Sequence, residues 1–313
     1  MLFGVMVHQR FELTNSKEKY MTELVLGTVQ FGLDYGITNT SGEIADNSVK
    51  EMLTFAEENG INVFDTAADY GNSQYRLGQL SPAGASIRYV TKFSLPSDGS
   101  MPNPENVFRY SMDLLKVEKL HGVLFHKLPD LSDSRFEDAL NILRAGRDNG
   151  ILSRIGVSIY NRADLLLALE VFPDLDLLQL PANVLDVNLL ESDEVRMLKS
   201  RGVEIHVRSV FLQGLLLTSP TQLSDFFEPL KPALIKLQNV AEETGRSVLE
   251  LVLAKIRHHS SVDAVLVGAT TLGELAEITS AWKSASEFQD FELPGVPTNI
   301  LDPRVWPKVR INP

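Results

Sequence analysis

The chain has 313 residues, no cysteine and a formal net charge of -12 at pH 7. The acidic balance, without any stretch rich in Lys and Arg, argues against a nucleic-acid partner, and the lack of cysteine excludes disulfides, thiolate zinc sites and iron–sulfur clusters. No apolar run reaches the roughly 18 residues of a membrane span, and the start of the chain does not match a signal peptide, so we expect a cytoplasmic protein without a membrane partner.

Eight short apolar runs recur along the chain, and longer helix-like segments separate them. The runs are mostly continuous rather than alternating, which is typical of parallel strands that are covered on both faces. Three of the helical segments close on Gly60, Gly150 and Gly202, and glycine is favoured just past a helix end. In chain order, the predicted strands are LVLG from residue 24, INVFDT from 61, YVTKF from 89, GVLFH from 122, RIGVSI from 154, LLQL from 177, EIHVRS from 204 and AVLVGA from 264.

Eight strand–helix units predict a single-domain α/β protein, a (β/α)8 TIM barrel. The rival fold, a doubly wound sheet, would normally carry a G-x-G-x-x-G turn after its first strand, and this chain has LGTVQFG there. We divide the chain into an N-terminal extension (1–20), the barrel (21–293) and a C-terminal tail (294–313). A segment with three prolines, Leu212 to Lys236, follows the seventh strand and is predicted to cover the mouth or flank of the barrel.

Polar residues stand where three consecutive strands end. Asp65 ends the second strand and Tyr70 follows in its loop, Lys92 lies near the end of the third strand, and His126 ends the fourth. The active site of such a barrel lies at the carboxyl ends of its strands. We therefore expect these four side chains to converge, although each alone has an ordinary structural reading as a turn cap, loop tyrosine, surface lysine or hydrogen-bonded histidine.

This set suits the reduction of a carbonyl group. Hydride transfer leaves negative charge on the carbonyl oxygen, and a tyrosine can donate the proton. The ordinary tyrosine pKa is about 10, and we expect the Lys92 ammonium to lower that of Tyr70. Asp65 would hold Lys92 in place, and His126 would orient the carbonyl oxygen through an imidazole N–H.

The segments GINVFDTAADYGNSQYRLGQL, VTKF and LFHKLPD resemble the signature of the aldo-keto reductase superfamily. Residue by residue, Asp65, Tyr70, Lys92 and His126 match its catalytic tetrad, and the likeness extends from about Leu24 to Lys283. The resemblance implies a nicotinamide cofactor that binds across the barrel mouth, together with a small carbonyl substrate.

The same resemblance implies a set of cofactor contacts. Ser158 and Gln179 match contacts to the carboxamide, Arg208 and Ser209 match the stacking position and the start of the pyrophosphate loop, and Gly214 matches the glycine of that loop. Gly268, Ala269, Thr270 and Thr271 match the phosphate loop at the adenine end, before a helix N-terminus. The family's habit implies NADP(H). NAD(H) is the alternative, because Glu274 would repel a 2′-phosphate.

Several features leave the function open in detail. The opening GTVQFGLDYGI and the closing ILDPRVW resemble bacterial members associated with surface-sugar biosynthesis, which implies a keto-sugar or nucleotide-sugar substrate. A cofactor-binding regulatory or assembly subunit, like the potassium-channel β-subunits of this superfamily, is the second hypothesis, and the complete tetrad favours an enzyme. Gln30, Phe31 and Tyr35 are candidates to touch substrate. The pair His258–His259, on a predicted helix, lacks companion ligands, so we expect no metal site. The sequence does not predict an oligomeric state.

Overall fold

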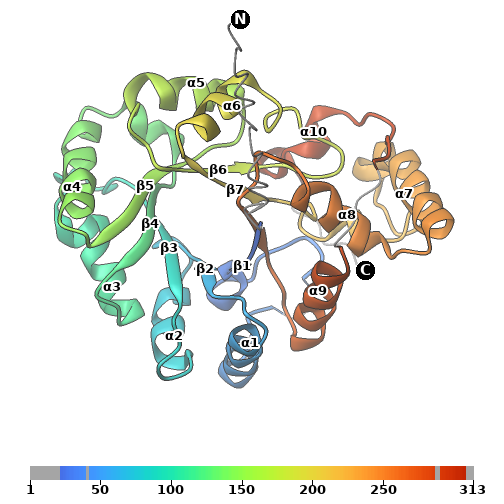
Figure 1. Cartoon of the computed structure of the whole chain (residues 1–313), viewed down its shortest axis with the longest axis horizontal. Helices are drawn as coiled ribbons and strands as arrows, with labels where there is room; N and C mark the ends of the chain where they lie inside the picture. The colour runs from blue at the N-terminus through green and yellow to red at the C-terminus, as the bar shows by residue number, and fades with distance from the viewer. Residues whose placement is uncertain (1–21, 40–41, 286–289, 308–313) are drawn as a thin grey trace, which may run out of the picture.

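The computed structural model describes residues 22–39, 42–285 and 290–307, and it is a closed barrel of eight strands with helices around it (Figure 1). Each strand pairs in parallel with the next in the sequence, and β8 closes the barrel on β1. This confirms the predicted fold. The strands are β1 (Glu23–Gly27), β2 (Val63–Asp65), β3 (Arg88–Phe93), β4 (Leu120–Phe125), β5 (Leu152–Ser158), β6 (Leu177–Pro181), β7 (Glu204–Arg208) and β8 (Ala264–Val267).

The continuous apolar strands bury both of their faces. One small set of side chains fills the inside of the barrel: Val25, Val63, Val90, Leu124, Leu177, Ala264 and Leu266. A larger apolar cluster joins the other strand face to the surrounding helices. The closed ladder leaves no open edge and gives all eight strand ends a common mouth.

The helices alternate with the strands as the sequence predicts. They are α1 (Asp46–Glu58), α2 (Ser73–Leu80), α3 (Tyr110–Leu115), α4 (Phe136–Asp148), α5 (Arg162–Val171), α6 (Asp193–Ser200), α7 (Lys231–Thr244), α8 (Val248–Arg257), α9 (Leu272–Ser284) and α10 (Thr298–Leu301). Local capping helps to set several starts, because the side chains of Asn161, Ser192, Ser247 and Thr271 accept backbone N–H bonds at α5, α6, α8 and α9. None of the helices in the described residues is both long and apolar enough to cross a bilayer.

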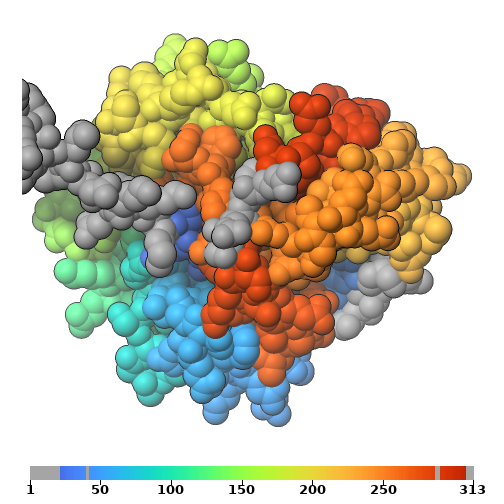
Figure 2. All heavy atoms as spheres, turned by 45° about the vertical axis from the view of Figure 1, so that its right-hand side comes forward, coloured from blue at the N-terminus to red at the C-terminus, as the bar shows by residue number. Residues whose placement is uncertain are grey.

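Two additions flank the barrel mouth. The predicted segment after β7 is partly helical: it contains the short turns Leu215–Leu217 and Asp225–Leu230, and its last residues belong to α7, which lies outside α8 (Figure 1). The C-terminal part, with α10 and the turn Pro303–Val305, packs between the α5–α6 side and the α7 side (Figure 2). Trp306 anchors it, with its ring edge-on to Phe227 at 5.0 Å and its Nε1 donating to the Ile300 carbonyl. The predicted extension 1–20 lies outside the described residues.

Candidate active site

Asp65, Tyr70, Lys92 and His126 meet at one end of the barrel, as the sequence predicts. Asp65 is the last residue of β2, Lys92 lies near the end of β3, His126 follows β4, and Tyr70 comes from the β2–α2 loop. All four line one cavity of about 430 Å³. They come from neighbouring strands, so the closed ladder alone brings them together.

A buried ion pair forms the base of this site. The Lys92 Nζ lies 2.5 Å from the Asp65 Oδ1 and 3.0 Å from the Thr66 carbonyl oxygen. The second carboxylate oxygen of Asp65 accepts from the Gln179 Nε2 at 2.8 Å, and the Ser158 hydroxyl donates to the Gln179 Oε1 at 3.3 Å. A single hydrogen-bonded chain therefore runs across the barrel from β3 through β2 to β6 and β5.

The environment of Lys92 makes this pairing obligatory. The Lys92 residue is 1 % exposed and Asp65 is 3 % exposed. Burial lowers the pKa of the Lys92 ammonium, while the charge of Asp65 and its hydrogen bond act in the opposite direction. Removing either partner would leave an uncompensated charge in the barrel, which typically costs about 3–5 kcal/mol.

Tyr70 lies above this pair, with its ring centre 5.1 Å from the Lys92 Nζ. Its pKa lies above the ordinary tyrosine value, because burial and the negative charge of Asp65 both disfavour the phenolate. The expectation that Lys92 lowers the Tyr70 pKa is therefore wrong for this arrangement. The carboxylate that neutralises Lys92 also faces the phenol, and the phenol stays protonated at neutral pH.

His126 packs edge-on against Tyr70, with ring centres 5.6 Å apart. Burial, followed by the positive charge of Lys92, lowers its pKa from 6.5 to about 4. The His126 Nδ1 lies 3.6 Å from the Asp69 Oδ2, which is too far for a hydrogen bond. His126 is therefore a neutral imidazole at neutral pH, and it can offer one N–H to an oxygen in the cavity.

Two glycines fix the position of the Tyr70 loop against the β1 loop. A Cβ on Gly71, whose φ is +55°, would lie 2.2 Å from the Gly32 carbonyl oxygen, and a Cβ on Gly32 would lie 2.0 Å from the Tyr70 carbonyl oxygen. The two backbones can touch only because neither residue has a side chain. The buried Arg76 holds the same β1 loop through the carbonyls of Phe31 and Ile44. The motifs GTVQFG and DYG thus meet next to Tyr70.

The residues predicted to contact a cofactor border the same cavity, with one exception. Its lining includes Ser158, Gln179, Arg208, Ser209, Gly214, Gly268, Ala269, Thr270 and Glu274. Thr271 is not part of this lining, and its side chain instead caps α9 by accepting from the Glu274 N–H. The Arg208 guanidinium lies over the Tyr160 ring at 4.1 Å and donates to the Ile159 carbonyl at 2.8 Å. Ile159 itself is fully buried.

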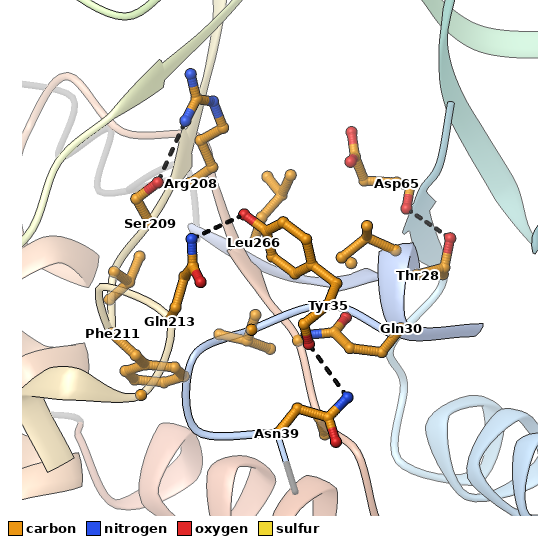
Figure 3. A pocket seen from close by; sticks show the side chains of 18 of the residues that line it. Thr28, Gln30, Tyr35, Asn39, Asp65, Arg208, Ser209, Phe211, Gln213 and Leu266 are labelled. Atoms are coloured by element: carbon orange, nitrogen blue, oxygen red, sulfur yellow. Dashed lines mark hydrogen bonds between the residues drawn. The ribbon is translucent and has the colours of Figure 1, made fainter. Parts of the chain in front are cut away.

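The β1 and β7 loops face each other over the cavity, and the sequence alone did not indicate this contact. Figure 3 shows the Tyr35 and Gln213 side chains reaching toward one another from the two loops. The Gln213 Oε1 accepts from the Ile37 N–H at 3.1 Å, and the Thr38 hydroxyl donates to the Gln213 carbonyl at 2.9 Å. The contact therefore joins two loops that both line the cavity.

Of the three candidates for substrate contact, Gln30 and Tyr35 line the cavity, whereas Phe31 is fully buried in the apolar core and does not. The Gln30 Oε1 is buried without a hydrogen-bond partner in the described part of the chain. Its amide lies so close to Gly268 that a Cβ there would be 2.6 Å from the Gln30 Nε2. An unsatisfied acceptor in this position suits a ligand that brings O–H or N–H donors, as the ribose and carboxamide of a nicotinamide cofactor do.

The start of α9 is already occupied by a carboxylate of the chain itself. The Glu274 side chain accepts from the Thr270 N–H at 2.6 Å and from the Thr270 hydroxyl at 2.9 Å. A free helix N-terminus attracts phosphate, but this one presents a negative charge next to the Gly268–Thr271 loop. Lys92 and Arg208 are the only lysine and arginine among the described residues that line the cavity, and neither belongs to the Gly268–Glu274 segment.

The sequence analysis did not predict a cluster of polar side chains on the floor of the barrel. Glu204 and His206 lie two residues apart on β7, so their side chains share one face of the strand. The His121 and His206 Nε2 atoms both lie within hydrogen-bond distance of the Glu204 Oε1, at 2.9 and 2.6 Å. Burial alone would raise the pKa of Glu204, but the two imidazoles hold it below its ordinary value. These three residues have metal-binding side chains within 4.8 Å of one another. The i, i+2 pair on one strand was the signal available in the sequence.

The prediction that His258 and His259 lie on a helix is wrong. Helix α8 ends at Arg257, and His258 is its C-cap residue. The His258 ring instead lies 3.0 Å from the Ala285 carbonyl, through its Nε2. The His–His pair therefore packs at a helix end, away from the cavity at the barrel mouth.

Comparisons with known proteins agree with this geometry. The model of the Aldo/keto reductase family matches residues 23–293. An aldo-keto reductase of Mycolicibacterium smegmatis is 28% identical over 127 residues, which cover 40% of this chain and 44% of that relative, so the match spans less than half of the relative's length.

Solved structures with the same fold include an aldo-keto reductase of Bacillus halodurans in its holo form, with a TM-score of 0.64 and 18% identity over 83% of this chain and 86% of that one. They also include a glycerol dehydrogenase of Gluconobacter oxydans, with a TM-score of 0.62 and 20% identity over 84% of this chain and 89% of that one. At these identities the likeness establishes the fold.

The contact between Gly71 and Gly32 yields a test with a matched control. Gly71 and Gly84 both have positive φ, but a Cβ on Gly84 would meet nothing within 4 Å. We expect Gly84→Ala to cost about 1–2 kcal/mol from backbone strain alone, and Gly71→Ala to cost about 1–3 kcal/mol more because of the clash. Urea unfolding of both variants measures the difference. Equal losses would contradict the close packing of the two loops.

Proposed function

Because the chain belongs to the aldo/keto reductase family, we propose that it is an NAD(P)H-dependent oxidoreductase that reduces a carbonyl group to an alcohol, with Tyr70 as the proton donor. The observation that carries the proposal is the convergence of a neutral phenol, a neutral imidazole and a buried Lys–Asp pair in one cavity. This set supplies a proton, orients an oxygen and stabilises developing negative charge.

Four residues have distinct roles in the proposed reaction. A bound reduced nicotinamide supplies the hydride to the carbonyl carbon. The Tyr70 hydroxyl donates its proton to the oxygen as charge develops there, and the His126 N–H orients that oxygen. An alkoxide is a stronger base than a phenolate, so a phenol with a raised pKa still gives up its proton. Lys92, held by Asp65, places a positive charge 5.1 Å from the Tyr70 ring, which offsets only part of the cost of the phenolate that remains.

We propose Ser158 and Gln179 as the carboxamide contacts and Arg208 as the stacking platform, with Ser209, Gly214 and the Gly268–Thr271 loop along the remainder of the cofactor. Ser158 and Gln179 are paired residues on β5 and β6, and their side chains are already joined. Arg208 is fixed by Ile159 and Tyr160, which keeps its guanidinium plane in place. Thr271 contributes by capping α9 rather than through the cavity wall.

The arrangement at α9 favours NADH as the cofactor, rather than the NADPH that the family's habit implies. The Glu274 carboxylate would repel a 2′-phosphate and would instead suit ribose hydroxyls. For the substrate, the family resemblance at both ends of the chain supports a keto-sugar or nucleotide-sugar. The alternative role, a regulatory or assembly subunit, gains no support from the geometry, because the proton donor and its neighbours are complete.

Replacing Tyr70 tests the assignment of the proton donor. Tyr70→Phe keeps the ring and removes the proton, so NADH binding, measured by protein fluorescence, should persist. Loss of an acid–base catalyst typically lowers the rate by about 10² to 10⁴, and we expect that loss in aldehyde reduction. Wild-type turnover in Tyr70→Phe would refute the assignment and make His126 the next candidate.

The pH dependence of the reduction rate tests the protonation states of Tyr70 and His126. Reduction needs protonated Tyr70, which is consumed only as the pH rises through its raised pKa, above 10. His126 is neutral above about pH 4. We therefore expect the reduction rate to stay level from about pH 5 to 9, whereas the reverse oxidation should accelerate as the pH rises. An inflection near 6.5 in the reduction rate would contradict a neutral His126.

The cofactor preference depends on the charge at Glu274. We expect the wild-type protein to bind NADH more tightly than NADPH, and Glu274→Arg to shift the ratio toward NADPH by about tenfold or more, because a repulsive charge becomes an attractive one. Glu277→Arg makes the same charge change on the same helix, away from the cavity lining, and should leave the ratio unchanged. Titration by fluorescence measures both ratios. An unchanged ratio in Glu274→Arg would show that Glu274 does not face the 2′-position.

A further inference from the structure

A second cavity, of about 510 Å³, lies beside the first. The loops after β5 and β6 form one wall, and the C-terminal residues 298–305 form the other. Tyr160 and Arg208 line both cavities, so they form the shared wall between the two. Apart from Arg208, none of the residues assigned above to the cofactor lines the second cavity, which leaves it for another ligand group.

The shared wall is a stack of three side chains. The Tyr160 ring lies between two guanidiniums, with the Arg208 Cζ and the Arg304 Cζ each 4.1 Å from its centre. Tyr160 and Tyr70 line the same first cavity, so this wall belongs to the cavity of the proposed proton donor. Because Tyr160 lines both cavities, a substrate that reaches from Tyr70 to the second cavity must pass its ring.

Two asparagines that line this cavity, Asn183 and Asn161, keep side-chain N–H donors available. Asn183 is 3 % exposed, and its Oδ1 accepts from the Leu185 N–H at 2.9 Å. Its amide N–H groups have no acceptor among the described residues, and Asn183 lines the cavity. Asn161 repeats the pattern, because its Oδ1 accepts from the Asp164 N–H at 3.0 Å. Each amide oxygen already accepts one hydrogen bond, and the amide N–H groups remain as donors for an oxygen that accepts hydrogen bonds.

The charged residues of the lining also favour a ligand that accepts hydrogen bonds. Three arginines and two aspartates line the cavity: Arg162, Arg208, Arg304, Asp186 and Asp302. Arg162 uses only its Nη2 for Glu194, and Arg304 uses its Nε and Nη2 for Asp302, so each keeps at least one guanidinium nitrogen without a carboxylate among the described residues. Within the described chain, Arg208 has no carboxylate at ion-pair distance. A half-buried, unpaired guanidinium beside unused N–H donors suits a carboxylate or a phosphate, which accepts several hydrogen bonds at once.

We propose that the second cavity is a subsite for an anionic carboxylate or phosphate group at the far end of the carbonyl substrate. This inference rests on the proposed function, since the carbonyl is placed at Tyr70, and it specifies the substrate class. The Arg162 and Arg304 guanidiniums and the Asn183 amide hold the anion, and the Arg208 charge attracts it across the shared wall. The C-terminal segment thereby becomes part of the substrate site.

Matched substrates test the subsite. With saturating NADH, kcat/KM is measured for succinic semialdehyde against butanal and for glyceraldehyde 3-phosphate against glyceraldehyde. We expect the charged member of at least one pair to be preferred by about tenfold, which corresponds to about 1.4 kcal/mol, and the preferred pair tells a carboxylate from a phosphate. The double variant Arg162→Met/Arg304→Met should lower that charged-to-neutral ratio by about tenfold. The control Arg196→Met removes an exposed arginine of α6 that does not line the cavity, and it should leave the ratio unchanged.

Binding measurements without turnover separate the proposed subsite from the proposed reductase function. Inorganic phosphate and succinate are titrated by calorimetry with NADH present, which fills the phosphate positions of the cofactor. We expect saturable binding of at least one of them to the wild-type protein and to Arg196→Met, and at least fivefold weaker binding to the double variant. If no aldehyde is reduced but this difference appears, the subsite stands and the proposed function fails. If aldehydes are reduced with equal preference within each pair and the double variant binds both anions like the wild type, the subsite is overturned.

Discussion

The candidate site depends on one costly interaction, the burial of the Lys92 ammonium inside the barrel. A buried lysine retains its charge only when a partner compensates for lost hydration, and Asp65 does so at 2.5 Å. The carboxylate is itself held from the far side by Gln179, which Ser158 contacts in turn. The pairing therefore fixes side chains on four strands at the mouth, and a change in any of them would disturb the geometry of the others.

The same pair sets the electrostatics of the groups above it. Burial and the negative charge of Asp65 keep the Tyr70 phenol protonated, while burial and the positive charge of Lys92 keep His126 neutral. Both states suit the reduction of a carbonyl: the tyrosine has a proton to give, and the imidazole can donate a hydrogen bond without adding charge. The arrangement favours reduction over oxidation near neutral pH, because the phenolate that the reverse reaction needs is scarce.

Much of this could be predicted from the sequence, for a definite physical reason. Continuous apolar runs indicate strands that are buried on both faces, and a closed parallel barrel brings successive strand ends together, so Asp65, Lys92 and His126 had to meet. The features that could not be predicted depend on residues far apart in the chain. They include Tyr35 against Gln213, Arg304 against Tyr160, and His121 against Glu204. The direction of the Tyr70 pKa shift was also not predicted, because it depends first on how deeply the folded chain buries the phenol and then on the nearby charge of Asp65.

The most direct test of carbonyl reduction follows the deuterium of labelled NADH. The label is placed at C4 of the nicotinamide, on the face that transfers hydride. The wild-type protein is incubated with this cofactor and an aldehyde, and the product alcohol is examined by NMR. The account predicts deuterium on the carbon that carried the carbonyl, at one of its two positions only, because the substrate is held in a single orientation against Tyr70 and His126. Tight cofactor binding without deuterium in any alcohol, across neutral and anionic aldehydes alike, would contradict it.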